Sequence, residues 1–414
     1  MMLRFFNKAE QGFFYSFSGV IGLQVFLEAG FAQSVTQFTS REFAFLRWNS
    51  SGALKGSSQS LSKLRSLVQQ ANRYYRMMAG ILVMLLSVGG CWFFSTRPSE
   101  GVPWLVPWLV ASFAAGFNFM LTPLWAFIEG CNRVAELAIY RLSSTLLGFI
   151  ITALGLVLNL GIHVVSLVAV ANLLFAVVYI ICRWRLLLVQ VHRPVGKFSI
   201  SWKDEVWSFQ WRIALSWMSR YFLEAGIAPL AFVLGGPVLA GKTGMTFQII
   251  RMIGSVTNTW TTTKIPSWGA LAARGCWEEL EKSWREAAKR NVAFTVIGLG
   301  AFVGGFPILA AFVPQVADRF LSANSLLCFA LGWFFYSFWL VSMHYTRSLR
   351  KEPFMLLHML VAILFLSGTC AVSAIDKEAA IPVVFALVHF PTIFLAFTIR
   401  RKTRESLKQA VALS

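Results

Sequence analysis

The chain has 414 residues, of which 57% are hydrophobic and only 13% are charged, and its formal net charge is +19. Soluble domains carry roughly 25% charged residues, so this composition excludes an ordinary soluble protein and indicates a polytopic membrane protein. In that class the excess of Lys and Arg belongs to cytoplasmic loops, so the charge does not indicate nucleic-acid binding.

Apolar runs long enough to cross a bilayer about 30 Å thick predict eleven transmembrane helices. Five precede a polar gap, at 12–46, 74–94, 102–128, 143–160 and 164–182. Six follow it, at 208–235, 244–268, 292–313, 320–345, 355–372 and 381–399. The sequence therefore predicts an all-α membrane protein with an N-terminal bundle over 1–190, a cytoplasmic linker over 191–207 and a C-terminal bundle over 208–414.

Lys and Arg residues are concentrated in alternate loops. The loops after the first, third and fifth predicted spans are rich in them, whereas the second has only Arg97 and the fourth has none. Residues 274–290 and the tail at 400–408 continue the basic series. The positive-inside rule places these segments, and with them the C-terminus, in the cytoplasm.

Residue patterns typical of catalytic or metal sites are missing from the sequence. The six cysteines are scattered without a CxxC pair, and the five histidines form no HExxH motif. No Walker loop, GxGxxG motif or catalytic triad is recognisable. We therefore expect no metal, no cofactor and no enzymatic activity.

The two halves of the chain contain a parallel internal repeat. The stretch 9–22 is followed by the charged segment 61–76, and the stretch 241–254 is followed by the charged segment 277–290. Four pairs of positions match, namely Gly12 with Gly244, Gly22 with Gly254, Leu64 with Leu280, and Ala71 with Ala287. Such repeats are common in transporters, and this one predicts two pseudo-symmetric bundles. The N-terminal bundle then lacks the partner of the 208–235 helix.

Four blocks of this chain carry a resemblance to a known family. AEQGFFYSFSGVIGLQVFLEAGFAQSVTQFTSRE at 9–42 resembles the second-helix region of Wzx-like lipopolysaccharide flippases, the polysaccharide biosynthesis proteins of the MOP exporter superfamily. WSFQWRIALSWMSRYF, LGGPVLAGKTGMTFQI and KIPSWGALAARGCWEELEKSWREAAKR are similar to the start and middle of that family's second bundle. The resemblance implies a MATE/MOP-like fold of twelve helices, of which this chain lacks the first.

The resemblance also implies a function and a location. It implies a multi-pass protein of the bacterial cytoplasmic (inner) membrane that flips an undecaprenyl-diphosphate-linked oligosaccharide for surface polysaccharide synthesis (O-antigen, capsule or exopolysaccharide). The bilayer, and the glycan polymerase and ligase of the same pathway, would be its partners. Transport would occur by alternating access through a cavity between two rocking bundles.

A polar stripe on the predicted helix at 244–268 is the main candidate for a cargo site. At 100° per residue its members share one face: Gln248, Arg251, Ser255, Asn258 and Thr262. An arginine can bind phosphate oxygens bidentately, and hydroxyls and amides can bind sugar and water. The stripe is therefore interpreted as the wall of a wet, cationic cavity.

Further candidates lie on neighbouring helices. Arg212 and Arg220 accompany the stripe, and a mid-membrane charge such as Arg220 needs a cavity or a partner. Glu224, one turn later, is either that partner or a group for ion or proton coupling. Glu28 in the first span is likewise a pairing residue or a coupling site, with pairing favoured. The repeat predicts a cavity face there as well, at Ser16, Gly19, Phe26, Gly30, Gln33 and Gln37.

Three other functions fit a polytopic chain of this kind. A multidrug cation exporter of the same superfamily would need acidic cavity residues, whereas the mid-membrane balance here is basic. A membrane-embedded glycan polymerase or glycosyltransferase would need a large outer loop, and the predicted outer loops are short. A scaffold without cargo would have no use for the arginine in the stripe.

Overall fold

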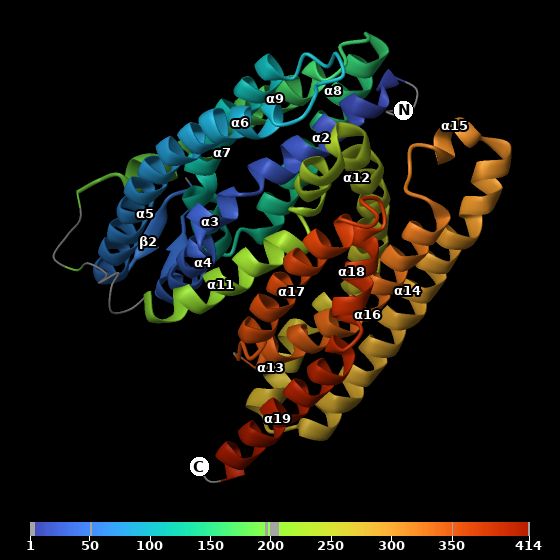
Figure 1. The fold of residues 1–414 in the computed structure, drawn as a ribbon. Coiled ribbons are helices and arrows are strands. Elements are labelled where there is room, and N and C mark those ends of the chain that lie inside the picture. Colours follow the sequence, from blue (N-terminus) through green and yellow to red (C-terminus); the bar gives the residue numbers. More distant parts are fainter. Residues whose placement is uncertain (1–4, 50–51, 195–197, 199–206, 350, 413–414) are drawn as a thin grey trace. The chain divides into compact units, whose positions relative to one another are not determined.

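The computed structural model describes residues 5–49, 52–194, 198, 207–349 and 351–412, with the backbone alone at 207–210, 212–213, 273 and 409–412. The chain divides into two compact units, Met1–Met218 (unit 1) and Ser219–Ser414 (unit 2). Both are built from helices, which are coloured along the chain in Figure 1.

Unit 1 is a helical bundle centred on α7. Its helices are α2 (Lys8–Ile21), α3 (Gln24–Glu28), α4 (Phe31–Phe43), α5 (Ser58–Met84), α6 (Gly90–Ser95), α7 (Leu105–Gly130), α8 (Val134–Val157) and α9 (His163–Val191). A π-helical turn, Leu85–Gly89, joins α5 to α6, and α11 (Trp207–Leu223) leads from unit 1 into unit 2. Within the unit, α7 packs against α4, α5 and α9, and α8 packs against α9.

Unit 2 repeats this arrangement around α16. Its helices are α12 (Ile227–Thr262), α13 (Ile265–Ala273), α14 (Trp277–Phe312), α15 (Pro314–Ala317), α16 (Ala323–Ser348), α17 (Met355–Ser373), α18 (Ala380–His389) and α19 (Thr392–Ala412). Here α16 packs against α12, α14, α18 and α19, and α17 packs against α18. The central helix α16 thus has neighbours in the same chain order as α7, which packs against α4, α5 and α9 in unit 1. The α17–α18 contact likewise corresponds to the α8–α9 contact, as the internal repeat predicts.

The matched leucine and alanine positions of the repeat have matching environments within their own units. Leu64 and Ala71 on α5 are buried, with exposed fractions of 1% and 0%. Leu280 and Ala287 on α14 are buried likewise, at 0% and 4%. These positions therefore form the inner faces of equivalent helices, and the two pseudo-symmetric bundles are confirmed.

The number of spans is close to the eleven expected. Among the described residues nine helices are long and apolar enough to cross a membrane, or ten when the bent pair Lys8–Glu28 and Phe31–Phe43 counts as one span. One of the nine, Ala214–Ala272, has 59 residues. At 1.5 Å per residue it is far too long for a single crossing, and it covers residues 214–235 of one expected span and all of the next, 244–268.

The break inside this long segment is built by glycine and proline. Gly235 and Gly236 depart from helical geometry within α12, and Gly236 has φ of +79°. Glycine adopts this conformation without steric cost, and Pro237, which follows, provides no amide hydrogen for the preceding turn. A second break, after Leu223, separates α11 from α12, so the span expected at 208–235 is interrupted within its length.

The expected first span, over 12–46, is likewise broken and does not form a single helix. Ala29 and Gly30 both have positive φ, at 48° and 71°, and end α3 before α4 begins. The two parts of this segment are bent by 52°. A short antiparallel hairpin, which the all-α expectation omitted, follows it and pairs β1 (Leu46–Trp48) with β2 (Leu54–Gly56).

Candidate functional site

A polar cavity lies in unit 2 among α11, α12 and α16. Its volume is about 440 Å³. It is lined by Arg220, Glu224, Gln248, Arg251, Met252, Gly254, Ser255, Asn258, Trp333, Leu340 and His344. We call it the unit 2 cavity. Four of the five residues of the predicted stripe, all on α12, line it.

The stripe lines one wall because α12 is attached to the bundle by another face. Asn291 Nδ2 on α14 donates to the Thr257 carbonyl at 3.0 Å, and Thr295 Oγ1 donates to Thr257 Oγ1 at 3.1 Å. Thr257 lies about 120° around the helix from Arg251 at 100° per residue. The contact with α14 therefore leaves the Arg251 face directed into the cavity.

One positive charge in the cavity is neutralised by a neighbour on the same helical stretch. Arg220 Nε donates to Glu224 Oε1 at 2.9 Å, and Arg220 Nη2 donates to Glu224 Oε2 at 3.2 Å. Tyr336, on α16, donates its hydroxyl to Glu224 Oε1 at 3.0 Å. Bidentate pairs of this kind are geometrically specific and strong. Glu224 is therefore engaged by two partners, and the pairing alternative for Arg220 is realised.

Arg251 supplies the second positive charge, and it has no acidic partner among the described residues. Its side chain is half-buried and lines the cavity. Among the described residues that line the cavity, Glu224 is the only carboxylate, and it is paired with Arg220. The two arginines of the lining therefore outnumber its carboxylate, and the cavity wall carries a net positive charge.

Neutral polar groups surround Arg251 in the cavity. Asn258 Nδ2 lies 3.2 Å from His344 Nε2, which connects α12 to α16. Asn258 Oδ1 is buried and has no hydrogen-bond partner among the described residues. Gln248 and Ser255 are exposed along the same wall. The arrangement can bind an anion through Arg251 and hydrogen-bond a polyhydroxylated group beside it.

The close approach of α12 to α16 beside the cavity depends on Gly254. A Cβ atom added there would lie 2.2 Å from Trp333 Cζ2. Overpacking of this kind usually costs about 1–3 kcal/mol. We expect Gly254→Ala to lower the melting temperature of the purified protein, while Gly300→Ala, whose Cβ would meet nothing within 4 Å, leaves it unchanged or raises it. Equal melting temperatures for the two variants would contradict this packing.

Some expected site residues lie elsewhere. Thr262 ends α12 and is exposed one turn beyond Asn258, so it does not line the unit 2 cavity although it shares the helix face. Arg212 belongs to α11, but its side chain lies outside the described residues.

The expected cavity face in unit 1 is not continuous. Ser16 and Gly19 are buried inside the bundle, whereas Gln33 and Gln37 are exposed on α4. The breaks between α2 and α4 interrupt the helix on which these positions were expected to share a face. Glu28 lies at the end of α3 and has no ion-pair partner among the described residues, so the favoured pairing of Glu28 is not found there.

The cavity wall contributed by α16 was not predicted from the sequence. Trp333, Leu340 and His344 line the cavity, and Tyr336 contacts Glu224. Their spacings of 3 and 4 put them on one helix face, which periodicity could have detected. That this face of α16 lies opposite Arg220 and Arg251 follows only from the packing of α16 on α12.

The chain is similar in structure to solved transporters. No protein-family model and no curated protein matches it. It resembles an inward-facing multidrug resistance MATE family transporter of the MOP superfamily with a TM-score of 0.71 and 13% identity, covering 99% of this chain and 97% of that one. The fold is that of MATE transporters of the MOP superfamily. An outward-facing multidrug resistance MATE family transporter matches with a TM-score of 0.62 and 15% identity, over 96% of this chain and 87% of that one.

The likeness agrees with the fold class expected from sequence. A multi-pass helical protein with a MATE/MOP-like arrangement of two bundles is confirmed. At 13–15% identity it is the fold that is shared.

Proposed function

We propose that this protein is a transporter that flips a lipid-diphosphate-linked oligosaccharide across the cytoplasmic membrane for surface polysaccharide synthesis. The observation that carries the proposal is the uncompensated Arg251 in the unit 2 cavity. A buried or half-buried arginine without a carboxylate partner is costly in a membrane protein unless an anion or water meets it. A cargo diphosphate supplies that anion.

The rest of the cavity suits the groups next to a diphosphate. A lipid-linked sugar has an anionic neck, a head with many hydroxyls and an apolar tail. Arg251 can bind the neck through two phosphate oxygens. Gln248, Ser255 and Asn258 provide hydrogen-bonding groups for the first sugar, and the unpartnered Asn258 Oδ1 accepts from a hydroxyl. The tail remains in the bilayer.

The cavity volume limits what is held at once. A volume of about 440 Å³ lies within the range of small-ligand sites. It accommodates the diphosphate and the sugar next to it, whereas the distal sugars extend beyond it. Recognition of the diphosphate neck does not depend on the composition of the distal sugars.

Alternating access is the mechanism that we propose for the movement. The MATE-like fold and the internal repeat support it, since parallel repeats in transporters commonly move against each other around a central site. We place the C-terminus and the basic loops in the cytoplasm by the positive-inside rule. Polymerase and ligase of the same pathway would act on the flipped product.

A multidrug exporter is the second candidate, and the comparison with multidrug resistance MATE transporters favours it. An exporter of cationic drugs needs a carboxylate that is free to attract them. In the unit 2 cavity Glu224 is occupied by Arg220 and Tyr336. The charge of this cavity therefore favours an anionic cargo over a cationic one.

Expression in two bacterial strains separates these functions. One strain lacks its oligosaccharide flippase, and the other lacks its drug exporters. We expect the protein to restore surface glycan in the first strain and to leave the sensitivity of the second to cationic drugs unchanged. Drug resistance without glycan rescue, at equal abundance in the membrane, would favour the exporter and overturn the flippase proposal.

A further inference from the structure

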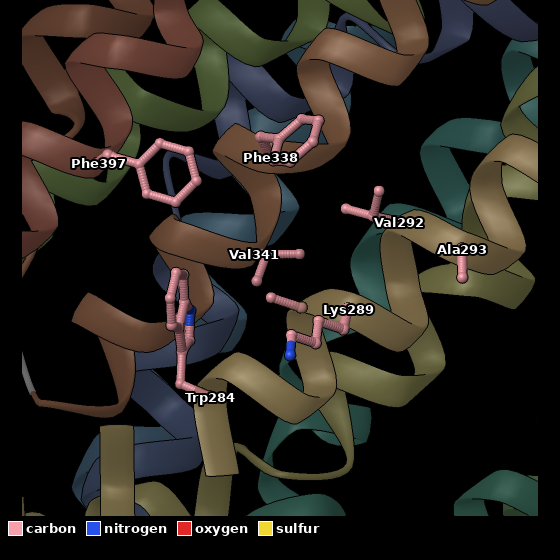
Figure 2. A pocket seen from close by; sticks show the side chains of 8 residues that line it. Trp284, Lys289, Val292, Ala293, Phe338, Val341 and Phe397 are labelled. Atoms are coloured by element: carbon pink, nitrogen blue, oxygen red, sulfur yellow. The ribbon is translucent and has the colours of Figure 1, made fainter. Parts of the chain in front are cut away.

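Unit 2 has two adjoining cavities at the charged ends of α14 and α19, away from the cavity described above. The first, which we call the apolar groove, has a volume of about 330 Å³ and is drawn in Figure 2. It lies among Trp284, Ala288, Lys289, Val292, Ala293, Phe338, Val341 and Phe397. The second, the basic pocket, has a volume of about 410 Å³. Lys289 belongs to both, so the two cavities meet at this residue.

The junction coincides with the change from apolar to charged sequence on both helices. Along α14 the charged residues end at Arg290, and 291–312 contains none. Along α19 the stretch 392–399 is uncharged, and charged residues begin at Arg400. A change of this kind marks the boundary between hydrocarbon and water. The apolar groove therefore borders the hydrocarbon, and the basic pocket borders the lipid headgroups.

An ion-pair cluster builds the wall between the cavities. Glu281 Oε2 accepts from Arg400 Nη1 at 2.8 Å and lies 2.9 Å from Arg404 Nη1, so α14 and α19 are held together. The Arg400 guanidinium carbon lies 3.5 Å from the centre of the Trp284 ring, a close cation–π contact. Trp284 is thereby held in place as the aromatic wall of the apolar groove.

The basic pocket retains positive charge after these pairs are formed. It is lined by Lys282, Arg285, Lys289, Arg404 and Lys408, together with Glu278, Glu281 and Glu286 and the ring of Trp277. Glu281, with a side-chain exposure of 11%, is surrounded by Arg285, Arg400 and Arg404. Lys282 and Lys289 are exposed and form no ion pair among the described residues, so they can bind an anion.

We propose that this composite cavity binds an anionic diacyl phospholipid of the surrounding leaflet. Its phosphate contacts Lys289 at the junction, its headgroup occupies the basic pocket, and one acyl chain lies in the apolar groove against Trp284 and Phe397. The division of the cavity into apolar and cationic parts matches the division of the lipid into chain and headgroup. Basic pockets between transmembrane helices are suited to such headgroups. This inference is independent of the cargo of the unit 2 cavity.

Native mass spectrometry of the purified full-length protein, titrated with phosphatidylglycerol or with phosphatidylcholine of the same acyl chains, tests the proposal. We expect phosphatidylglycerol to bind more tightly. Lys289→Glu changes the charge at the junction by two units, and each unit near a headgroup contributes roughly 1 kcal/mol. This variant should therefore bind phosphatidylglycerol about 30-fold more weakly. Ala293→Trp, which fills the apolar groove, should weaken binding of the lipid at least about tenfold through lost chain burial.

Matched controls distinguish the cavity from general effects. Arg274→Glu makes the same charge change at an exposed residue outside both cavities, and Ile297→Trp adds the same side chain to an exposed position one turn further along α14. Both controls should bind phosphatidylglycerol as the unaltered protein does. Equal binding of the two lipids, displacement of phosphatidylglycerol by inorganic phosphate alone, or an Ala293→Trp variant with unchanged affinity would each overturn the proposal.

Discussion

Replacement of Arg251 by Ala is expected to weaken binding of a short-chain lipid diphosphate sugar to the purified protein by about 10- to 100-fold. Hydrogen bonds to a charged group contribute roughly 1.5–3 kcal/mol, and Arg251 is the cation of the unit 2 cavity that forms no ion pair among the described residues. The fluorescence of a labelled lipid diphosphate, titrated against the protein in detergent, measures the change.

Two further variants identify the origin of the effect. Arg251→Lys keeps the charge but loses bidentate geometry, so its affinity should fall between those of the Ala variant and the unaltered protein. Lys264→Ala removes an exposed charge from the end of the same helical segment, outside the cavity, and should bind normally. Equal losses for Arg251→Ala and Lys264→Ala would indicate a general charge effect and contradict a specific role of Arg251.

Loss of Glu224 is expected to cause a large loss of stability. Glu224→Ala leaves the Arg220 guanidinium and the Tyr336 hydroxyl without their acceptor. Breaking a fully buried pair lowers the free energy of unfolding by roughly 3–5 kcal/mol. The Arg220 side chain is 34% exposed, so we expect a smaller loss here, about 2 kcal/mol. A fall in melting temperature of about 4–8 °C should result.

A double variant shows whether the isolated charge is the cause. Arg220→Met combined with Glu224→Leu removes both charges and should recover at least half of the lost melting temperature. Glu405→Ala breaks the Arg401–Glu405 pair, which has the same four-residue spacing but is exposed, and should leave the melting temperature unchanged. A double variant less stable than Glu224→Ala alone would contradict the explanation.

The cavity wall on α12 could be predicted because it is a property of one helix. Gln248, Arg251, Ser255 and Asn258 recur at helical spacing within an apolar stretch, and a helix of that kind must direct them to a single side. The same periodicity includes Thr262 but does not reveal where the cavity ends along the helix axis. That limit depends on α16, which provides the opposite wall.

The contribution of α16 could not be derived from the sequence because it depends on which helices pack together. Trp333 and His344 are about 80–90 positions away from the stripe in the chain. Their proximity follows from the contact at Gly254, where the absence of a side chain lets Trp333 approach α12. No local pattern in residues 333–344 indicates that α12 is the neighbour.

The break of the first span was missed for a different reason. Gly30 is a recognisable helix breaker, but Ala29 also adopts positive φ, which is costly for a residue with a side chain and has no sequence signal. Hydropathy does not register a bend of 52°, since both parts are apolar enough to lie in the membrane. The prediction that Gln33 and Gln37 share one face with Ser16 and Gly19 assumed an unbroken helix, which this bend interrupts.

Flipping in proteoliposomes shows whether the purified protein moves the lipid and whether Arg251 is needed. A lipid-diphosphate-linked oligosaccharide is incorporated with the purified protein, and its head on the outer surface is followed over time with an enzyme that modifies only accessible sugar. We expect the unaltered protein to expose the protected half of the lipid within the assay. Arg251→Ala, at equal reconstitution, should do so at no more than about one tenth of that rate. Equal rates for the two proteins would contradict the assignment of the cationic unit 2 cavity as the cargo site.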